Sequence, residues 1–309
     1  MTRLVCIVGP TASGKTTLAL ELGERLGAEV VSADSRQVYR RLDVGTAKPT
    51  AAERARVPHH CLDLVDPGET FDAARFCDAA HTAIADATRR GRPVLVVGGT
   101  GLYVRALVRG LCAAPRGDDA LRAALATVPA DERRRRLVAV DPAAAARIHP
   151  NDTFRTIRAL EVATVSGRPL SAWQAAHAFA GRAFEPLLIG LACATDALDA
   201  RIVARARDML ARGFLDEVRA LAATVPADAP AWRTVGYREM RACAEGRTDV
   251  ETALAATVLA TRQFAKRQRT WLRREPGLAW RDPVAEHDRL LDEVLRFLDG
   301  APSAVVPGS

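Results

Sequence analysis

The sequence lacks several features that would define other classes of protein. No apolar run approaches the roughly 18 residues that a membrane-spanning helix needs. The six cysteines are scattered without a Cys-x-x-Cys pair, which argues against a zinc site or a disulfide framework. His59, His60 and Cys61 are adjacent, but successive side chains on an extended segment point to opposite faces. We therefore expect no metal there, and free thiols in the cytoplasm. Because residues 1–8 read as a strand, we also expect no signal peptide and no membrane association.

Acidic residues are missing from one stretch near the C-terminus. Residues 261–274 contain six basic residues and no Asp or Glu, in a chain of net charge +7. Four of the cations are spaced i, i+4, i+7 and i+11 and share one face of an expected helix over 249–274: Arg262, Lys266, Arg269 and Arg273. Without acids to pair with, they repel one another unless an anionic partner lies against them. This pattern favours contact with nucleic acid over a solvated basic surface.

What the sequence does contain near its start is a glycine-bounded loop between an apolar run and a helical pattern. A strand, such a loop and a helix form the context of a phosphate-binding loop, whose backbone N–H groups converge on an anion. Its residues are Gly9, Pro10, Thr11, Ala12, Ser13, Gly14, Lys15 and Thr16. We expect Lys15 to reach terminal phosphate oxygens and the Thr16 hydroxyl to bind Mg²⁺. The loop alone does not say which phosphate compound it holds.

Strand and helix signals alternate through the first hundred residues, which predicts an α/β fold: a doubly wound parallel sheet with a phosphate loop. Further strands are expected at 29–33, 60–64 and 93–97, and a helix capped by Thr70 at 71–90. Strand signals then vanish. We predict four parts: a first core segment (1–115), a helical insertion domain (116–186), the rest of the core with a rejoining strand and C-terminal helices (187–299), and a disordered tail (300–309).

Three groups of residues near expected strand ends could carry chemistry. Asp34 could ligate Mg²⁺, act as a general base or cap a turn. The strand at 93–97 ends in Gly98–Gly101 rather than in the acid of most P-loop ATPases, which counts against a motor-type ATPase. That segment offers backbone N–H groups and the Thr100 hydroxyl, or it is a turn that needs positive φ angles. Arg201 and Arg205, four residues apart on a helix at 196–212, could grip phosphate or form a surface pair.

Five segments together resemble one family in their order along the chain. They are 9–16, 34–39 (Asp-Ser-Arg-Gln-Val-Tyr), 45–49 (Gly-Thr-Ala-Lys-Pro), 98–103 and 261–271. The family is the bacterial tRNA dimethylallyltransferases, also called tRNA isopentenyltransferases, and the resemblance covers residues 3 to about 280. Cys61 and the segment 235–239 depart mildly from its pattern, and the zinc-finger extension of eukaryotic relatives is absent.

The resemblance implies transfer of a dimethylallyl group from dimethylallyl diphosphate to the N6 amine of the adenosine 3′-adjacent to the anticodon. Lys15, Mg²⁺ on Thr16 and Arg205 would then stabilise the leaving diphosphate. Asp34 would be the general base, with Thr100 positioning the donor or the base. The adenine would have to leave the stack of the anticodon loop. A monomer is expected.

By the same resemblance, a larger set of residues would face the anticodon stem-loop of tRNA, and the insertion would close over the stem. The set is Asp34, Ser35, Arg36, Gln37, Thr100, Arg122, Arg155, Arg158, Val235, Gly236, Tyr237, Arg238, Lys266, Arg267, Arg269 and Arg273. Three alternatives explain the residues less completely. A small-molecule kinase needs no basic helix, a transferase acting on free adenine nucleotides needs no insertion, and an RNA-binding module leaves the phosphate loop idle.

Overall fold

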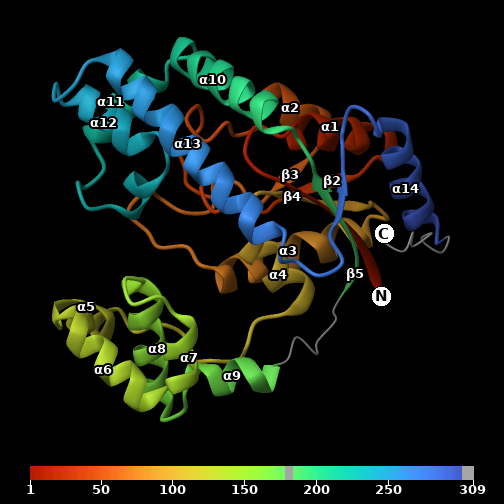
Figure 1. Cartoon of the computed structure of the whole chain (residues 1–309). Coiled ribbons are helices and arrows are strands. Elements are labelled where there is room, and N and C mark those ends of the chain that lie inside the picture. The colour runs from red at the N-terminus through yellow and green to blue at the C-terminus, as the bar shows by residue number, and fades with distance from the viewer. Residues whose placement is uncertain (178–183, 301–309) are drawn as a thin grey trace. The chain divides into compact units, whose positions relative to one another are not determined.

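The computed structural model of the chain describes residues 1–177 and 184–300, so the predicted tail lies outside the described residues except for Gly300. Its centre is a parallel six-stranded sheet with the order β3-β2-β4-β1-β5-β6 (Figure 1). The strands are β1 (Thr2–Val8), β2 (Glu29–Ser32), β3 (His59–His60), β4 (Val94–Gly98), β5 (Phe184–Leu191) and β6 (Ala279–Arg281). The predicted α/β class with a parallel sheet is thereby confirmed.

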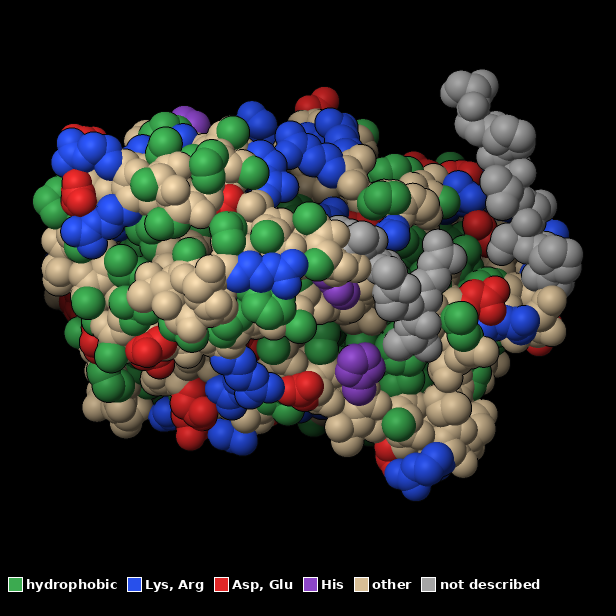
Figure 2. All heavy atoms as spheres, turned by 90° about the horizontal axis from the view of Figure 1, so that it is seen from below, with side chains coloured by type: hydrophobic (Ala, Val, Ile, Leu, Met, Phe, Trp, Pro, Cys, Tyr) green, Lys and Arg blue, Asp and Glu red, His purple; other side chains and the backbone are tan. Residues whose placement is uncertain are grey.

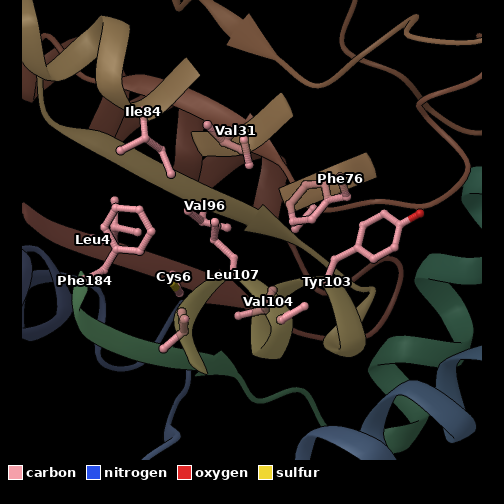
Figure 3. Packing of buried hydrophobic residues seen from close by; sticks show 14 of the residues in the cluster. Leu4, Cys6, Val31, Phe76, Ile84, Val96, Tyr103, Val104, Leu107 and Phe184 are labelled. Carbon is pink, nitrogen blue, oxygen red and sulfur yellow. The ribbon is translucent and has the colours of Figure 1, made fainter. Parts of the chain in front are cut away.

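Helices cover both faces of this sheet because its inner strands are apolar on both sides. On one face, α1 (Lys15–Leu26) and α14 (His287–Asp299) pack against β1, β4 and β5. On the other lie α3 (Ala73–Arg89) and α4 (Gly101–Arg109). Figure 3 shows the core of this second face, where the rings of Phe76 and Tyr103 stack with their centroids 4.4 Å apart. Two buried layers hold the sheet rigid and leave its carboxyl edge for function.

The remaining helices follow in two groups. Residues 1–108 and 184–300 form one compact unit, and residues 109–177 form a second unit that is wholly helical. The second unit contains α5 (Asp119–Thr127), α6 (Ala130–Val140), α7 (Pro142–Arg147), α8 (Thr153–Ser166) and α9 (Leu170–His177). The first unit also contains α2 (Ala51–Arg56), α10 (Thr195–Ala211), α11 (Phe214–Ala222), the 3₁₀ helix η1 (Pro230–Arg233), α12 (Tyr237–Ala244) and α13 (Val250–Leu272). None of the helices in the described parts is long and apolar enough to cross a membrane.

Two local predictions were wrong. The helix expected from 71 begins at Ala73, and its cap is Asp72, whose carboxylate accepts hydrogen bonds from the backbone N–H groups of Ala74 and Arg75. A carboxylate satisfies two of the free N–H groups of the first turn. The strand expected at 60–64 stops after His60, because Cys61 and Asp63 adopt left-handed φ angles of 61° and 55° that end the ladder.

The register of the sheet brings the functional loops together. Val8 in β1 pairs with Gly98 in β4, and Ser32 in β2 pairs with Val97. The three strands therefore end at the same level. As a result the phosphate loop, Asp34 and the turn after Gly98 lie side by side at the carboxyl edge, as expected for ligands of a doubly wound sheet.

Candidate active site

The carboxyl edge opens into a cavity of about 370 Å³ within the unit formed by residues 1–108 and 184–300. Its polar lining includes Lys15, Thr16, Asp34 and Arg205. Its apolar lining comes from α10, α11 and α13: Ile202, Ala206, Met209, Phe214 and Phe264. The cavity therefore offers both anion-binding groups and apolar surface, which suits a ligand that carries a phosphate and a hydrocarbon group.

The phosphate loop is folded as the motif requires. Gly14 has a left-handed φ of 94° at the N-terminus of α1, a conformation that favours glycine. The Lys15 ammonium donates to the backbone carbonyls of Gly9 at 3.0 Å and Pro10 at 2.7 Å, so it is held across the loop. A second hollow of about 260 Å³ lies on the loop and is lined by residues 12–17 with Arg201 and Arg205. Both arginines thus stand where a phosphate would be bound.

Charged groups lie close together at the phosphate loop. Burial and, to a smaller extent, the nearby Arg205 lower the pKa of Lys15 to about 7, against the opposing effect of Asp34. Burial also lowers the pKa of Arg205, again opposed by Asp34. Two cations share one carboxylate here, so an anion of higher charge is needed to balance them. A diphosphate would supply that charge.

Asp34 both caps a turn and faces the cavity. Its Oδ1 accepts a hydrogen bond from the backbone N–H of Arg36 at 2.8 Å. The same side chain lines the large cavity and a smaller neighbouring one that Thr16 also lines. Of the three possible roles of Asp34, the turn cap is therefore observed, and the carboxylate also lines the cavity in which a metal ligand or a general base would act.

Thr100 holds the segment that carries Asp34. Its Oγ1 accepts the backbone N–H of Ser35 at 3.0 Å and donates to the Ser35 hydroxyl at 3.3 Å. The Thr100 backbone N–H donates to the Ala33 carbonyl at 3.2 Å. Thr100 is thus bonded on both sides of Asp34, and it can position that carboxylate without touching it.

The glycines after β4 are required for close packing rather than for positive φ. None of Gly98, Gly99 and Gly101 has a positive φ, so the possibility left open by the sequence, a turn that needs positive φ angles, does not apply. A Cβ atom on Gly98 would overlap the backbone of Ala33, and one on Gly101 would overlap the ring of Trp271. On Gly99 it would overlap the amide of Gln268. The turn needs glycine because α13 and the end of β2 press against it.

The cations on the basic face of α13 differ in their partners and in their exposure. Arg262 pairs with Asp199 of α10 at 3.4 Å, and Arg269 donates to the Thr195 hydroxyl at 3.3 Å. The acid missing from the segment itself is therefore supplied by a neighbouring helix, which only the tertiary structure reveals. Lys266 and Arg273 are exposed, and Arg267 stacks over Phe264 at 5.8 Å and lines the cavity.

The residues of the segment 235–238 differ in their surroundings. Val235 lines the cavity, whereas the Arg238 side chain is 80% exposed and pairs with Glu239. The Gly236 backbone N–H donates to Glu239, capping α12. Tyr237 is 0% exposed, so its side chain does not reach the surface, contrary to its predicted place among the RNA-facing residues. It donates its hydroxyl hydrogen to Glu217 instead.

The arginines predicted to bind RNA in the helical unit differ in what they contact. Arg122 and Arg158 both pair with the fully buried Glu161, at 2.8 and 2.6 Å. Those two ion pairs compensate a buried carboxylate, which is costly to leave alone. Arg155 is 70% exposed and, within residues 1–177 and 184–300, forms an ion pair only with the capping Asp152. Of the three, Arg155 is the most available for a partner.

The sequence reasoning missed several residues that line the cavity, among them the apolar residues of α10 and α11 and three polar ones. Arg233 and Thr234, after η1, line the cavity, and so does Gln268 of α13. Gln268 could have been recognised from the sequence. It lies three residues after Ala265 and four before Leu272, so it belongs to the buried stripe of its helix. A polar residue on an apolar stripe indicates a specific buried hydrogen-bond partner. Arg233 and Thr234 gave no comparable sign.

The residues present fit a Mg²⁺ ion that arrives with its phosphate ligand. No cluster of three or more His, Cys, Asp or Glu suited to a metal occurs among residues 1–177 and 184–300. Thr16, Ser32 and Asp34 nevertheless line one small hollow beside the phosphate loop. Mg²⁺ commonly uses one or two protein oxygens together with substrate phosphates and water, rather than an all-protein cage.

Charge on the molecular surface is mixed on at least one face. In Figure 2, Lys and Arg side chains are interspersed with Asp and Glu, and no continuous patch of one sign covers the face shown. Electrostatic attraction of a polyanion depends on local clusters such as the exposed cations of α13.

Comparisons with known proteins agree on one family. Residues 37–275 match the sequence model of a family described as IPP transferase, and residues 2–64 match one described as isopentenyl transferase. The chain is 49% identical over 301 residues to a tRNA dimethylallyltransferase of Geobacter metallireducens, covering 96% of this chain and 97% of the relative. It is 52% identical over 296 residues to a tRNA dimethylallyltransferase of Anaeromyxobacter dehalogenans, covering 94% and 99%.

Solved structures give the same result. A tRNA isopentenylpyrophosphate transferase from Bacillus halodurans superposes with a TM-score of 0.71 at 37% identity, covering 97% of this chain and 96% of that one. A eukaryotic dimethylallyltransferase acting on tRNA superposes with a TM-score of 0.84 at 26% identity, covering 98% and 81%.

Proposed function

The chain belongs to the IPP transferase family, and on that premise we propose how its cavity carries out transfer of a dimethylallyl group to tRNA. The acceptor we propose is tRNA, as in these relatives, at the exocyclic N6 amine of the adenosine 3′-adjacent to the anticodon. The donor we propose is dimethylallyl diphosphate. The observation that supports this choice is the cavity itself, which joins the phosphate loop and Arg205 to an apolar wall on α10, α11 and α13.

The diphosphate of the donor would lie on the phosphate loop. Lys15, Arg205 and the N-terminus of α1 would stabilise the negative charge that develops as the bond between the allylic carbon and the diphosphate oxygen breaks. Allylic cations form readily, so stabilising the leaving group supplies a large part of the acceleration. The five-carbon group would rest on the apolar wall, where Ile202, Met209 and Phe214 keep water away from the reacting carbon.

Asp34 is the residue we assign as general base. The N6 amine of adenine is conjugated with the ring and nearly non-basic, so it must lose a proton as its bond to carbon forms. That proton would pass to the Asp34 carboxylate, and the diphosphate would depart from the opposite side of the carbon. Thr100, through Ser35, would hold Asp34 in place.

A Mg²⁺ ion, when bound, would neutralise charge on the diphosphate and so improve it as a leaving group. Thr16 would provide a hydroxyl ligand, and Asp34 and Ser32 line the same hollow. The remaining ligands would come from the donor and from water.

The acceptor would enter from the side where arginines line the cavity. Arg36, Arg233 and Arg267 would meet phosphates of the tRNA around the target nucleoside, and Lys266 and Arg273 would extend this contact along α13. We further propose a cytoplasmic enzyme, because that is where free thiols such as Cys6 and Cys77 stay reduced. We expect it to act as a monomer.

One assay tests the proposed function. Labelled dimethylallyl diphosphate is incubated with unmodified tRNA and, separately, with AMP, and labelled ATP is offered with the same acceptors. We expect label on tRNA only, released by digestion as N6-modified adenosine. Label on AMP but not on tRNA, or phosphoryl transfer from ATP, would contradict the assignment.

A further inference from the structure

The Gln268 side chain bridges two catalytic loops from a third element. It extends from α13, is 7% exposed and lines the cavity. Its Oε1 accepts the backbone N–H of Thr11 in the phosphate loop at 2.8 Å, and its Nε2 donates to the backbone carbonyl of Gly99 at 3.0 Å. Because one partner can only donate and the other can only accept, the orientation of the amide is fixed.

The second partner continues the connection to Asp34. Gly99 precedes Thr100, which is bonded to Ser35 by its hydroxyl and to Ala33 by its N–H. One chain of contacts therefore runs from Thr11 through Gln268, Gly99 and Thr100 to the residues on either side of Asp34. It joins the loop that would hold the leaving diphosphate to the carboxylate that would take the proton.

The turn after β4 lies close against the Gln268 amide. A Cβ atom on Gly99 would overlap Gln268 Nε2, so the turn after β4 and the amide are closely fitted. The Thr11 N–H is used by Gln268 and is not one of the donors available to a phosphate. The amide is thus part of the frame of the site and not of its anion-binding surface.

We propose that Gln268 is a positioning residue that sets the spacing between the diphosphate site and the Asp34 base. This inference rests on the proposed function. Because Gln268 lies between Arg267 and Arg269 on α13, it also ties this spacing to a helix whose exposed cations would bind tRNA. The rate of an in-line transfer is sensitive to misplacement of the reacting groups by as little as about 1 Å.

Two variants of Gln268 separate positioning from simple packing. Gln268→Met keeps the length and removes both hydrogen bonds. Gln268→Glu keeps an acceptor for the Thr11 N–H, but as a carboxylate it repels the Gly99 carbonyl, whereas the protonated acid can donate to that carbonyl as the amide does. Gln263→Glu, which places the same charge at an exposed position of the same helix, is the matched control.

The measurements are kcat and KM for dimethylallyl diphosphate, with tRNA in excess, from about pH 5.5 to pH 8.5, together with tRNA affinity and the unfolding temperature. We expect Gln268→Met to lower kcat about 10- to 100-fold at every pH, with tRNA affinity within about twofold. We expect the kcat of Gln268→Glu to rise toward the wild-type kcat as pH falls. The ratio of the kcat of Gln263→Glu to the wild-type kcat should not change with pH.

Each outcome decides a separate question. Wild-type kcat and KM in Gln268→Met, or no acid recovery in Gln268→Glu, would overturn the inference. A lower unfolding temperature with unchanged kinetics would assign Gln268 a structural role only, and would overturn it too. A wild-type enzyme that does not modify tRNA would instead contradict the proposed function.

Discussion

The Tyr237 hydroxyl donates to the Glu217 carboxylate at 2.6 Å, and this pair anchors a loop that lines the cavity. The same carboxylate accepts the backbone N–H groups of Asp43, Val44 and Gly45 at 2.9, 2.7 and 3.2 Å. Burial and the neighbouring carboxylate both raise the pKa of Tyr237, so the phenol stays protonated and remains a donor. Gly45 and the next residue, Thr46, line the cavity.

We therefore expect Glu217→Ala to destabilise the enzyme and lower its activity. The change leaves three backbone N–H groups and a buried phenol without their acceptor, which costs about 1–3 kcal/mol or more. Thermal unfolding measures the first effect, and kcat with tRNA measures the second. Asp216→Ala, at an exposed position of the same helix, is the control and should change neither much. Equal stability of the Glu217 and Asp216 variants would contradict this role.

Asp34→Asn tests the general base without removing the turn cap. Asparagine keeps an oxygen that can accept the Arg36 N–H but cannot take a proton, so we expect a loss of about 10²- to 10⁴-fold in the single-turnover rate. Asp34→Ala removes both functions and should also affect stability. tRNA affinity, measured in parallel, should change little. A turnover rate of Asp34→Asn equal to the wild type would rule out Asp34 as the base.

The pH dependence of diphosphate binding should report Lys15. Its pKa of about 7 means that the side chain is a cation below pH 7 and loses its charge as pH rises through that value. Attraction to the anionic ligand is therefore largest on the acid side and weakens above about pH 7. Calorimetric titration with inorganic diphosphate between pH 6 and pH 8.5 measures this. Since the ligand also titrates, Lys15→Met is the reference, and the wild type should lose more affinity than this variant as pH rises.

The exposed cations of α13 should contribute to tRNA affinity through phosphate contacts. Replacing both Lys266 and Arg273 with Ala should weaken tRNA binding and reduce the slope of log affinity against log salt by about 1.5–2. Arg262→Ala should change the slope less, because that arginine already pairs with Asp199. An unchanged slope in the double variant would show that this face does not meet phosphate.

Local sequence was sufficient for much of the site. The spacing of Gly9, Gly14 and Lys15 predicted a phosphate loop, and the structure has that loop. The strand predicted at 93–97 forms as β4, which is buried and lies between β2 and β1. These features depend on neighbours within a few residues.

Features that depend on partners far along the chain could not be predicted. Arg262 was expected to lack an acidic partner, but Asp199 approaches it from α10. Tyr237 was expected at the surface, but it packs beneath Glu217. A need for positive φ was one possible reason for the glycines at 98–101, whereas the turn in fact needs space for Gln268 and Trp271 of α13.

The fold class, the phosphate loop and the family of the enzyme could be recognised before the structure was known, because short segments with fixed spacing encode them. Which groups meet in the cavity depends on the packing of distant elements. Gln268 comes within hydrogen-bonding distance of Thr11 across 257 positions of chain, and of Gly99 across 169. Contacts at such separations are set by how α13 packs against the carboxyl edge of the sheet, and no local pattern encodes that packing.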